Sequence, residues 1–281
     1  MILKEIKAAD ITAAVRDLCI SSNCNLNKDV LDKINEALDT EEISHAKEIL
    51  QMIIENQEIA RQSQLPICQD TGIAVVFVEL GQDVHIIGGN LKDAINEGVR
   101  IGYKEGYLRK SVVADPLMDR VNTGDNTPAI IHVEVVEGDK IRIVVCPKGA
   151  GSENMSSLAM LKPADGVEGV KRFVLDTVKK AGANPCPPII VGVGIGGNFE
   201  YAPYLAKKAL TRPIDIRHPV YGWLEEQLLR EINKLGIGPQ GLGGSTTALA
   251  VNIEVYPTHI AQLPVAVNIS CHVTRHREVV L

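Results

Sequence analysis

Leu65-Pro66-Ile67-Cys68-Gln69-Asp70-Thr71-Gly72 divides this sequence into a helical part and a part in which strands and helices alternate. Before it, apolar residues such as Ile11, Val15 and Leu18 recur at helical spacing, so residues 1–64 are predicted to be helical. Thr40 is expected to cap the last of these helices. Pro66 ends the helical region, because proline cannot continue a helix.

After this segment, apolar runs bounded by glycine, proline and polar residues predict further elements. The predicted strands cover residues 73–80, 84–87, 129–136, 140–146, 189–193, 246–256 and 259–270. The predicted helices cover residues 91–104, 167–181, 201–210 and 221–235. This order predicts an α+β fold, in which the helical region 1–64 precedes two α/β subdomains with mixed or antiparallel sheets. We expect residues 1–281 to form one catalytic domain.

Composition excludes several classes of protein. The 281 residues are 45% hydrophobic and 23% charged, as in a soluble globular chain with an ample core. The net charge of −6, without a basic block, argues against nucleic acid as the main partner. No apolar run is long enough to span a membrane, and charges interrupt the N-terminus where a signal peptide would be apolar. We therefore expect a cytoplasmic protein.

Three of the six cysteines lie in loops with proline, small or polar neighbours. These are Cys68, Cys186 before Pro187-Pro188, and Cys271 after Ser270. Iron–sulfur clusters prefer thiolate ligands, and three thiolates leave one iron without a protein ligand. That iron would act as a Lewis acid, so the pattern indicates chemistry on a hydroxyl group. The remaining cysteines, at positions 19, 24 and 146, are expected to be structural.

Several polar residues near these loops are candidates for acid–base work or anion binding. Asp70 lies two residues after Cys68, so its carboxyl group would lie close to any metal held there. Arg109 precedes a polar loop, and an arginine can bind a carboxylate through two parallel hydrogen bonds. His259 follows Pro257-Thr258 at an expected strand start. Arg109 could equally be a solvated surface charge, and His259 could be a structural histidine.

A glycine motif supports a rival hypothesis. Gly192-Val193-Gly194-Ile195-Gly196-Gly197 satisfies G-x-G-x-x-G, and Asp215 follows at a suitable distance for a dinucleotide site. The context is poor, because Pro213 and flanking charges interrupt the second strand that such a site requires. An NAD-dependent oxidoreductase therefore stays a remote alternative. The alternative interpretation is that the small residues of a glycine loop let backbone amides approach a cluster or an anion.

Six motifs in the same order make the chain resemble the class I, iron–sulfur fumarases. They are Pro66–Gly72, Leu108–Ser111, Asn122–Gly124, Lys148–Asn154, Cys186–Pro188 and Ser270–Cys271. The chain is similar to the alpha subunit of the two-subunit form, which is shared with L(+)-tartrate dehydratase. This resemblance covers nearly the whole chain.

The resemblance implies a set of site residues. In that family, cysteines matching Cys68, Cys186 and Cys271 hold a [4Fe–4S] cluster. The residue matching Asp70 is the proposed general acid, assisted by the histidine matching His259. Substrate-contacting positions match Gln69, Arg109 and Gly151. Ala150 departs from the family pattern, because single-chain members usually have glycine there.

The resemblance also implies a reaction and a partner. The expected activity is a hydro-lyase that reversibly dehydrates (S)-malate to fumarate, a small dicarboxylate, with L(+)-tartrate as the alternative substrate. Single-chain members have a further C-terminal domain that supplies the proposed base, so a separate beta subunit is expected to complete the site in a hetero-oligomer. A non-catalytic iron–sulfur sensor is a further hypothesis.

Overall fold

The structure, a computed structural model, describes residues 3–281. The chain forms two compact units. Unit 1 contains the residues up to Leu26 together with Gln57–Ala150 and Arg275–Leu281, and unit 2 contains Asn27–Asn56 and Gly151–Thr274. Among the described residues, no helix combines the length and apolar character that crossing a bilayer requires.

Unit 1 is built on a four-stranded mixed sheet. Its order is β10 (Arg277–Val280), β5 (Ile141–Lys148), β2 (Ile73–Gly81) and β4 (Ile130–Val136). β2 is parallel to β4 and antiparallel to β5, and β10 pairs antiparallel with β5. A separate parallel pair joins β1 (Lys4–Lys7) to β3 (Val84–Ile87). The predicted mixed sheet is confirmed.

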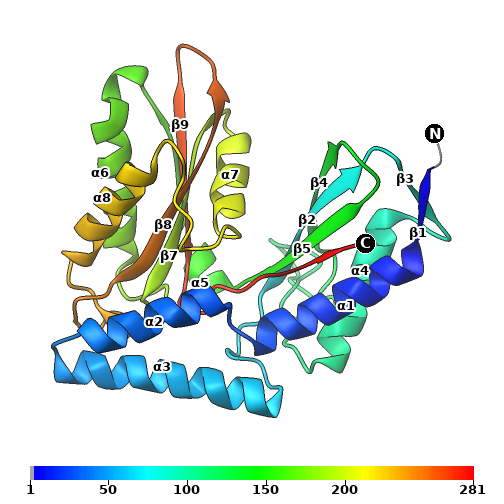
Figure 1. The fold of residues 1–281 in the computed structure, drawn as a ribbon, viewed down its shortest axis with the longest axis horizontal. Coiled ribbons are helices and arrows are strands. Elements are labelled where there is room, and N and C mark those ends of the chain that lie inside the picture. The colour runs from blue at the N-terminus through cyan, green and yellow to red at the C-terminus, as the bar shows by residue number, and fades with distance from the viewer. Residues whose placement is uncertain (1–2) are drawn as a thin grey trace. The chain divides into compact units, whose positions relative to one another are not determined.

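Helices α1 (Ala8–Cys24) and α4 (Leu91–Glu105) cover one face of this sheet (Figure 1). Their apolar faces and the inward residues of β2 and β5 share one core, in which Ile95 and Tyr103 are fully buried. The two helices approach closely at Gly98, where an added Cβ would lie 2.7 Å from the Thr12 carbonyl oxygen. Asn90 caps α4 by accepting a hydrogen bond from the Lys92 amide at 2.8 Å.

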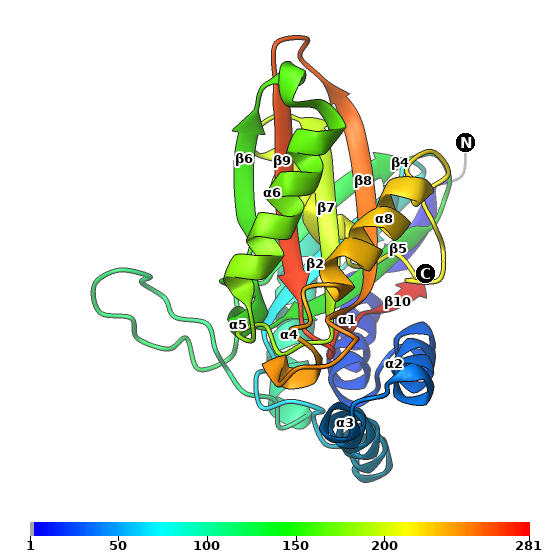
Figure 2. The ribbon, with the colours of Figure 1, turned by 90° about the vertical axis from the view of Figure 1, so that its left-hand side faces the viewer.

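Unit 2 is a second four-stranded mixed sheet with helices on both faces. Its order is β6 (Ser157–Leu161), β9 (Leu263–Ser270), β7 (Ile189–Gly197) and β8 (Ala248–Thr258). α6 (Gly166–Ala181) and α8 (Gly222–Asn233) pack on one face (Figure 2), and α7 (Tyr201–Ala209) packs on the other (Figure 1). α2 (Lys28–Thr40) and the Ser44–Asn56 part of α3 (Ser44–Ser63) also belong to this unit.

The Gly192–Gly197 motif forms part of a strand, which corrects the predicted glycine loop. β7 continues through it and pairs with β8 up to Gly197. An added Cβ would lie 2.2 Å from the Ala206 carbonyl oxygen at Gly192 and 2.1 Å from that of Ala202 at Gly194. The glycines therefore allow α7 to lie directly on the sheet. A dinucleotide site needs such glycines in the turn after a strand, so the oxidoreductase hypothesis loses its structural basis.

Other differences concern short elements and helix ends. β1, β6 and β10 were not predicted, whereas β3, which is equally short, was; β1 lies inside the region predicted to be helical. Thr40 is the last residue of α2 rather than the cap of the next helix, and its hydroxyl donates to the Glu36 carbonyl at 2.8 Å. α3 begins four residues later, at Ser44.

Candidate active site

The loop that contains Cys68 connects α3 to β2 within unit 1. The Ile67 amide donates to the Asn23 carbonyl at the end of α1, at 2.9 Å. At the other end of the loop, Gly72 has a φ of +74°, and an added Cβ would lie 2.6 Å from the Lys148 carbonyl carbon. Glycine is therefore required at this position, both by the backbone conformation and by the close approach of β5.

The Asp70 carboxylate is oriented by two main-chain donors. Its Oδ1 accepts a hydrogen bond from the Gly72 amide at 3.0 Å, and its Oδ2 accepts one from the Ala150 amide at 2.8 Å. Each carboxylate oxygen can take part in two hydrogen bonds, so one position on each oxygen remains for a proton or a substrate. The half-buried carboxyl group is thus held in one orientation with acid–base capacity left.

Arg109 is attached to the same loop through its main chain. The Thr71 hydroxyl donates to the Arg109 carbonyl at 2.9 Å, while the Arg109 side chain is exposed. Gln69 is exposed as well. Unit 1 therefore brings Cys68, Gln69, Asp70 and the backbone of Arg109 together, and leaves the Gln69 and Arg109 side chains accessible to an anionic ligand.

Three buried residues that support this loop were not predicted. The Tyr103 hydroxyl lies 2.8 Å from the Thr71 carbonyl and 3.0 Å from the Gly72 carbonyl. The Asn126 amide donates to the Gly72 carbonyl at 3.1 Å, and a guanidinium nitrogen of Arg275 donates to the Asp70 carbonyl at 2.6 Å. In the sequence, Tyr103 continues the apolar face of a helix, which gave no signal of a role at the site.

In unit 2, the other two candidate ligands lie at one end of the sheet. Cys186 precedes β7 and Cys271 follows β9. The His272 amide donates to the Cys186 carbonyl at 3.4 Å, and His272 Nδ1 lies 3.0 Å from the same oxygen. Adjacent segments of the chain thus place Cys186 and Cys271 in neighbouring loops.

The glycine-rich segment 236–245 supports both loops and was also missed. Its Gln240 donates to the Pro187 carbonyl through the main-chain amide at 2.8 Å and through Nε2 at 2.9 Å. The same Nε2 lies 3.2 Å from His272 Nδ1. Gln240 thereby joins the segment after Cys186 to the segment after Cys271. Its positive φ of 54° is unusual for a residue with a side chain.

The six thiols fall into two groups by exposure. Cys186 is exposed, and Cys68 and Cys271 are half-buried, whereas the other three are buried. Burial raises the pKa of Cys19 to about 12 and also raises that of Cys24, which disfavours the thiolate a metal requires. The donors that fit a cluster are therefore the three accessible loop cysteines. Within residues 3–281, no three His, Cys, Asp or Glu side chains are gathered in an arrangement that could hold a metal ion.

Gly151 begins the part of the chain that belongs to unit 2 after β5. It is exposed in the short helix α5 (Ala150–Glu153). The carboxylate of Glu153 anchors this helix, because it forms an ion pair with Lys207 and accepts a hydrogen bond from Asn268 Nδ2 at 3.0 Å. The main chain at Gly151 is thus accessible and lies in a helix that is anchored by partly buried polar contacts.

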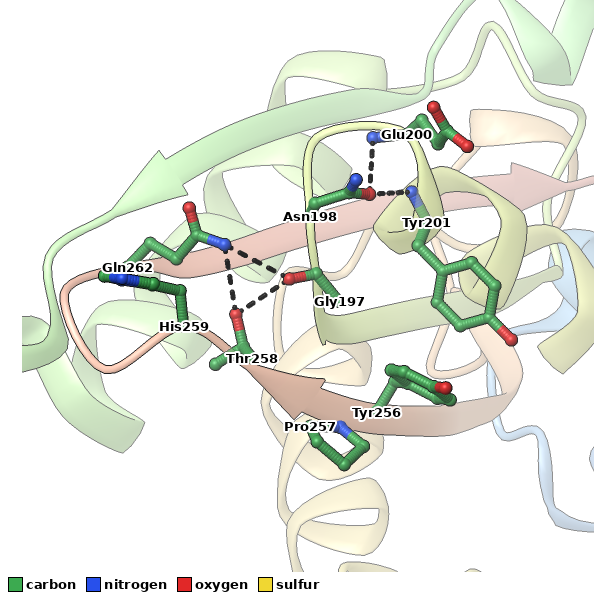
Figure 3. Close-up of a pocket in the computed structure, with 9 residues that line it drawn as sticks. All are labelled: Gly197, Asn198, Glu200, Tyr201, Tyr256, Pro257, Thr258, His259 and Gln262. Atoms are coloured by element: carbon green, nitrogen blue, oxygen red, sulfur yellow. Dashed lines mark hydrogen bonds between the residues drawn. The ribbon is translucent and has the colours of Figure 1, made fainter.

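His259 lies beside a cavity of about 490 Å³, in the loop that connects β8 to β9 (Figure 3). Thr258 Oγ1 donates to the Gly197 carbonyl at 2.9 Å, and Gln262 Nε2 donates to the same oxygen at 3.2 Å. The exposed imidazole accepts a hydrogen bond from the Ala261 amide on Nδ1 at 3.1 Å. In the neutral ring this contact places the proton on Nε2, which can donate to a ligand.

Within unit 2, His259 and the two cysteines lie at opposite ends of the sheet. At one end Ser270, the residue before Cys271, pairs with Ile190, and at the other end Gly197 pairs with Thr258. β9 alone spans about 23 Å at roughly 3.3 Å per residue. One copy of unit 2 therefore does not bring His259 to its own Cys186 and Cys271.

Known proteins match the chain over almost its whole length. The family model described as "Fumarate hydratase (Fumerase)" matches residues 12–280. A Methanocaldococcus jannaschii protein named "Putative L(+)-tartrate dehydratase subunit alpha" is 44% identical over 272 residues, covering 94% of this chain and 95% of that protein. The "L(+)-tartrate dehydratase subunit alpha" of Escherichia coli strain K12 is 34% identical over 267 residues, covering 93% and 87%. The chain belongs to the fumarate hydratase family.

Proposed function

We propose that this chain is the alpha subunit of a hydro-lyase that reversibly removes water from (S)-malate to give fumarate. Family membership supports the reaction class. The observation that carries the proposal is the fixed Asp70 carboxylate, which lies in the same loop as Cys68 and next to Thr71, the residue whose hydroxyl holds the backbone of Arg109. A general acid, a metal ligand and a carboxylate-binding side chain are the groups that dehydration of a hydroxy acid requires.

We further propose that Cys68, Cys186 and Cys271 hold a [4Fe–4S] cluster. Their accessibility and the burial of the other thiols support this choice of ligands. When bound, the cluster supplies a Lewis acid for the substrate hydroxyl group.

The chain's own residues account for binding and for one proton transfer. In the dehydration direction, Asp70 gives its proton to the departing hydroxyl oxygen as the carbon–oxygen bond breaks and its electron pair leaves with the oxygen. A base, which we expect from a beta subunit, takes the proton from the neighbouring carbon, and that electron pair forms the double bond. Arg109 holds a substrate carboxylate, while Gln69 and the main chain at Gly151 provide hydrogen bonds. This orientation lowers the entropic cost of the step.

His259 can assist Asp70 only if it reaches the cluster from outside its own unit 2. Its position at the far end of the sheet from Cys271 supports a site to which a second copy of the chain contributes this imidazole. In that arrangement the proton on Nε2 would face the acid–base centre. His259 is therefore a proposed catalytic residue of a site that a second copy of the chain completes.

L(+)-Tartrate is the second candidate substrate. The names of the relatives at 44% and 34% identity favour it, while the name of the family model favours fumarate. Tartrate has one hydroxyl group more than malate, and its dehydration gives the enol of oxaloacetate. The same acid, carboxylate-binding and metal-binding residues would serve both reactions.

The word "subunit" in the relatives' names supports a partner chain. We propose a beta subunit that completes the site in a cytoplasmic hetero-oligomer. The decisive experiment co-expresses the chain with a candidate beta subunit and assays the complex anaerobically on (S)-malate, fumarate and L(+)-tartrate. Hydration or dehydration of any of these supports the proposal, and the ratio of kcat/KM values identifies the substrate. A complex that loads its cluster but transforms none of them would instead be a sensor.

The ligand assignment has its own test in the same complex. Cys68→Ala, Cys186→Ala and Cys271→Ala should each lower the iron content and the brown colour of anaerobically purified protein. Cys146→Ala is the matched control, because this thiol is buried in β5 and should leave the iron content unchanged. Equal iron in all four variants would rule out the proposed ligand set.

A further inference from the structure

Arg275 is a buried cation without an acidic partner. Its side chain belongs to a residue only 3% exposed, and one guanidinium nitrogen donates to the Asp70 carbonyl at 2.6 Å. Its Nε is buried and has no hydrogen-bond partner. None of the ion pairs found among residues 3–281 includes Arg275.

Such an arrangement is costly for structure alone. A buried charge without a counter-charge is strongly destabilising, and one carbonyl acceptor satisfies only part of a guanidinium group. A residue that only supported the loop could be a neutral donor. The positive charge at this position therefore points to an anionic ligand bound at the same loop.

The charge acts on the surroundings of the Cys68–Gly72 loop. Burial raises the pKa of Tyr103, and the charge of Arg275 opposes this rise. The Tyr103 hydroxyl in turn lies within hydrogen-bonding distance of the carbonyls of Thr71 and Gly72. Burial also raises the pKa of Cys24, and the charge of Arg275 again opposes the rise. Arg275 therefore lies near enough to Tyr103 and Cys24 for its charge to act on both groups.

Neighbouring contacts fix the position of Arg275. It lies four residues after Cys271 and two residues before β10, in which Arg277 pairs with Val145 of β5. The Arg277 guanidinium donates to the carbonyls of Asn25 and Leu26 at 3.2 Å each. The segment that leaves Cys271 is thus anchored to the sheet of unit 1 just beyond Arg275.

We propose that Arg275 is a positioning residue that holds the Asp70 loop in its active conformation and places a positive charge beside the thiolate ligand and substrate of that loop. This inference rests on the proposed function. Arginine suits the task because its planar fork can hold the Asp70 carbonyl through one edge and present further N–H groups elsewhere.

The first test measures the loop itself in the chain without cluster or partner. In Arg275→Gln, hydrogen exchange at the Gly72 and Ala150 amides should accelerate, because the Asp70 carboxylate that accepts from both is no longer held in place. Arg277→Gln is the matched control: exchange should change near Asn25 and Leu26 and stay as in the wild type at Gly72 and Ala150. Wild-type exchange at these two amides in Arg275→Gln would overturn the positioning role.

The second test separates charge from hydrogen bonding in the cluster-loaded complex. Arg275→Gln should make the cluster harder to reduce, giving a more negative midpoint potential by electron paramagnetic resonance titration, and should lower kcat by about 10²-fold through misplacement of Asp70. Arg275→Lys should keep the wild-type potential and still lower kcat. A wild-type potential in Arg275→Gln would overturn the charge role, and wild-type kcat in Arg275→Lys would overturn the positioning role.

These readouts distinguish the inference from the proposed function. If the wild-type complex transforms none of the three acids, the proposed function fails. The exchange rates at Gly72 and Ala150 still decide whether Arg275 positions the loop. If Arg275→Gln does not fold, Arg275→Lys supplies the exchange measurement, with faster exchange supporting the role and wild-type exchange contradicting it.

Discussion

At the scale of single residues, the main chain rather than another side chain orients Asp70. The amides of Gly72 and Ala150 each donate to one carboxylate oxygen, and they come from segments almost 80 positions apart in the sequence. An acid held in this way needs no partner carboxylate or histidine within unit 1. Its placement depends on the loop conformation, which explains the buried contacts of Thr71, Tyr103 and Asn126 around it.

Asp70→Asn should lower kcat by about 10² to 10⁴, because an amide cannot donate the acid proton in the transition state. The iron content should stay at the wild-type level, since Cys68 is unchanged. Anaerobic steady-state kinetics and iron analysis of the complex check both outcomes. Asp115→Asn is the control, because Asp115 also accepts two main-chain hydrogen bonds in a loop of unit 1, at 2.7 Å each. Wild-type kcat in Asp70→Asn would remove Asp70 from the mechanism.

At the scale of elements, β7 carries the closest helix–sheet contact in unit 2. Gly194→Ala would place a Cβ 2.1 Å from the Ala202 carbonyl oxygen, so α7 or the sheet must move. We expect a loss of about 1–3 kcal/mol in the free energy of unfolding, as for other overpacked sites. Gly222→Ala, at the start of α8, is the control, because its nearest neighbour is the Arg217 side chain at 3.1 Å. Urea denaturation of both variants measures the difference, and equal stability would contradict close packing at β7.

The connection between α2 and α3 is fastened by a buried carboxylate. Glu41 Oε2 accepts hydrogen bonds from the Ser245 amide at 2.8 Å and the Ser245 hydroxyl at 2.9 Å. Burial acts to raise the pKa of Glu41, but the bonds from Ile43, Ser245 and Glu42 outweigh it and lower the pKa. Because the folded pKa is lowered, the stabilisation is present above the ordinary carboxyl pKa and is lost as pH falls through the folded value.

Glu41→Gln should therefore destabilise the chain at neutral pH by about 1.5–3 kcal/mol, the range for hydrogen bonds to charged groups. The difference from the wild type should shrink as the pH falls below the ordinary glutamate pKa of about 4.3. Urea denaturation at neutral and acidic pH measures this dependence. A difference that is the same at both pH values would show that the charge of Glu41 contributes nothing.

At the scale of the whole molecule, the position of His259 predicts a site shared between copies of the chain. Asp70→Asn and His259→Ala each lack one of the two proposed catalytic side chains and keep the other. If the imidazole comes from a second copy, mixing the two inactive variants should restore activity in about a quarter of the sites of a symmetric two-copy assembly. Each variant mixed with itself is the control. No recovery would place both residues in one chain's site, and full activity of His259→Ala alone would remove the histidine from catalysis.

Local sequence was enough to predict the long elements of the fold and the accessible cysteines. Periodic apolar residues and turn signals located the long helices and strands, from which the α+β class followed. Loop context separated Cys68, Cys186 and Cys271 from the thiols that the structure buries. Tertiary structure alone decided three other matters: the Gly192–Gly197 motif became a strand under α7, the short strands β1, β6 and β10 formed by pairing, and Tyr103, Asn126 and Arg275 converged on one loop. The physical reason is that helix period and turn chemistry act between near neighbours, whereas strand pairing, helix–sheet approach and burial of charge depend on residues far apart in the chain.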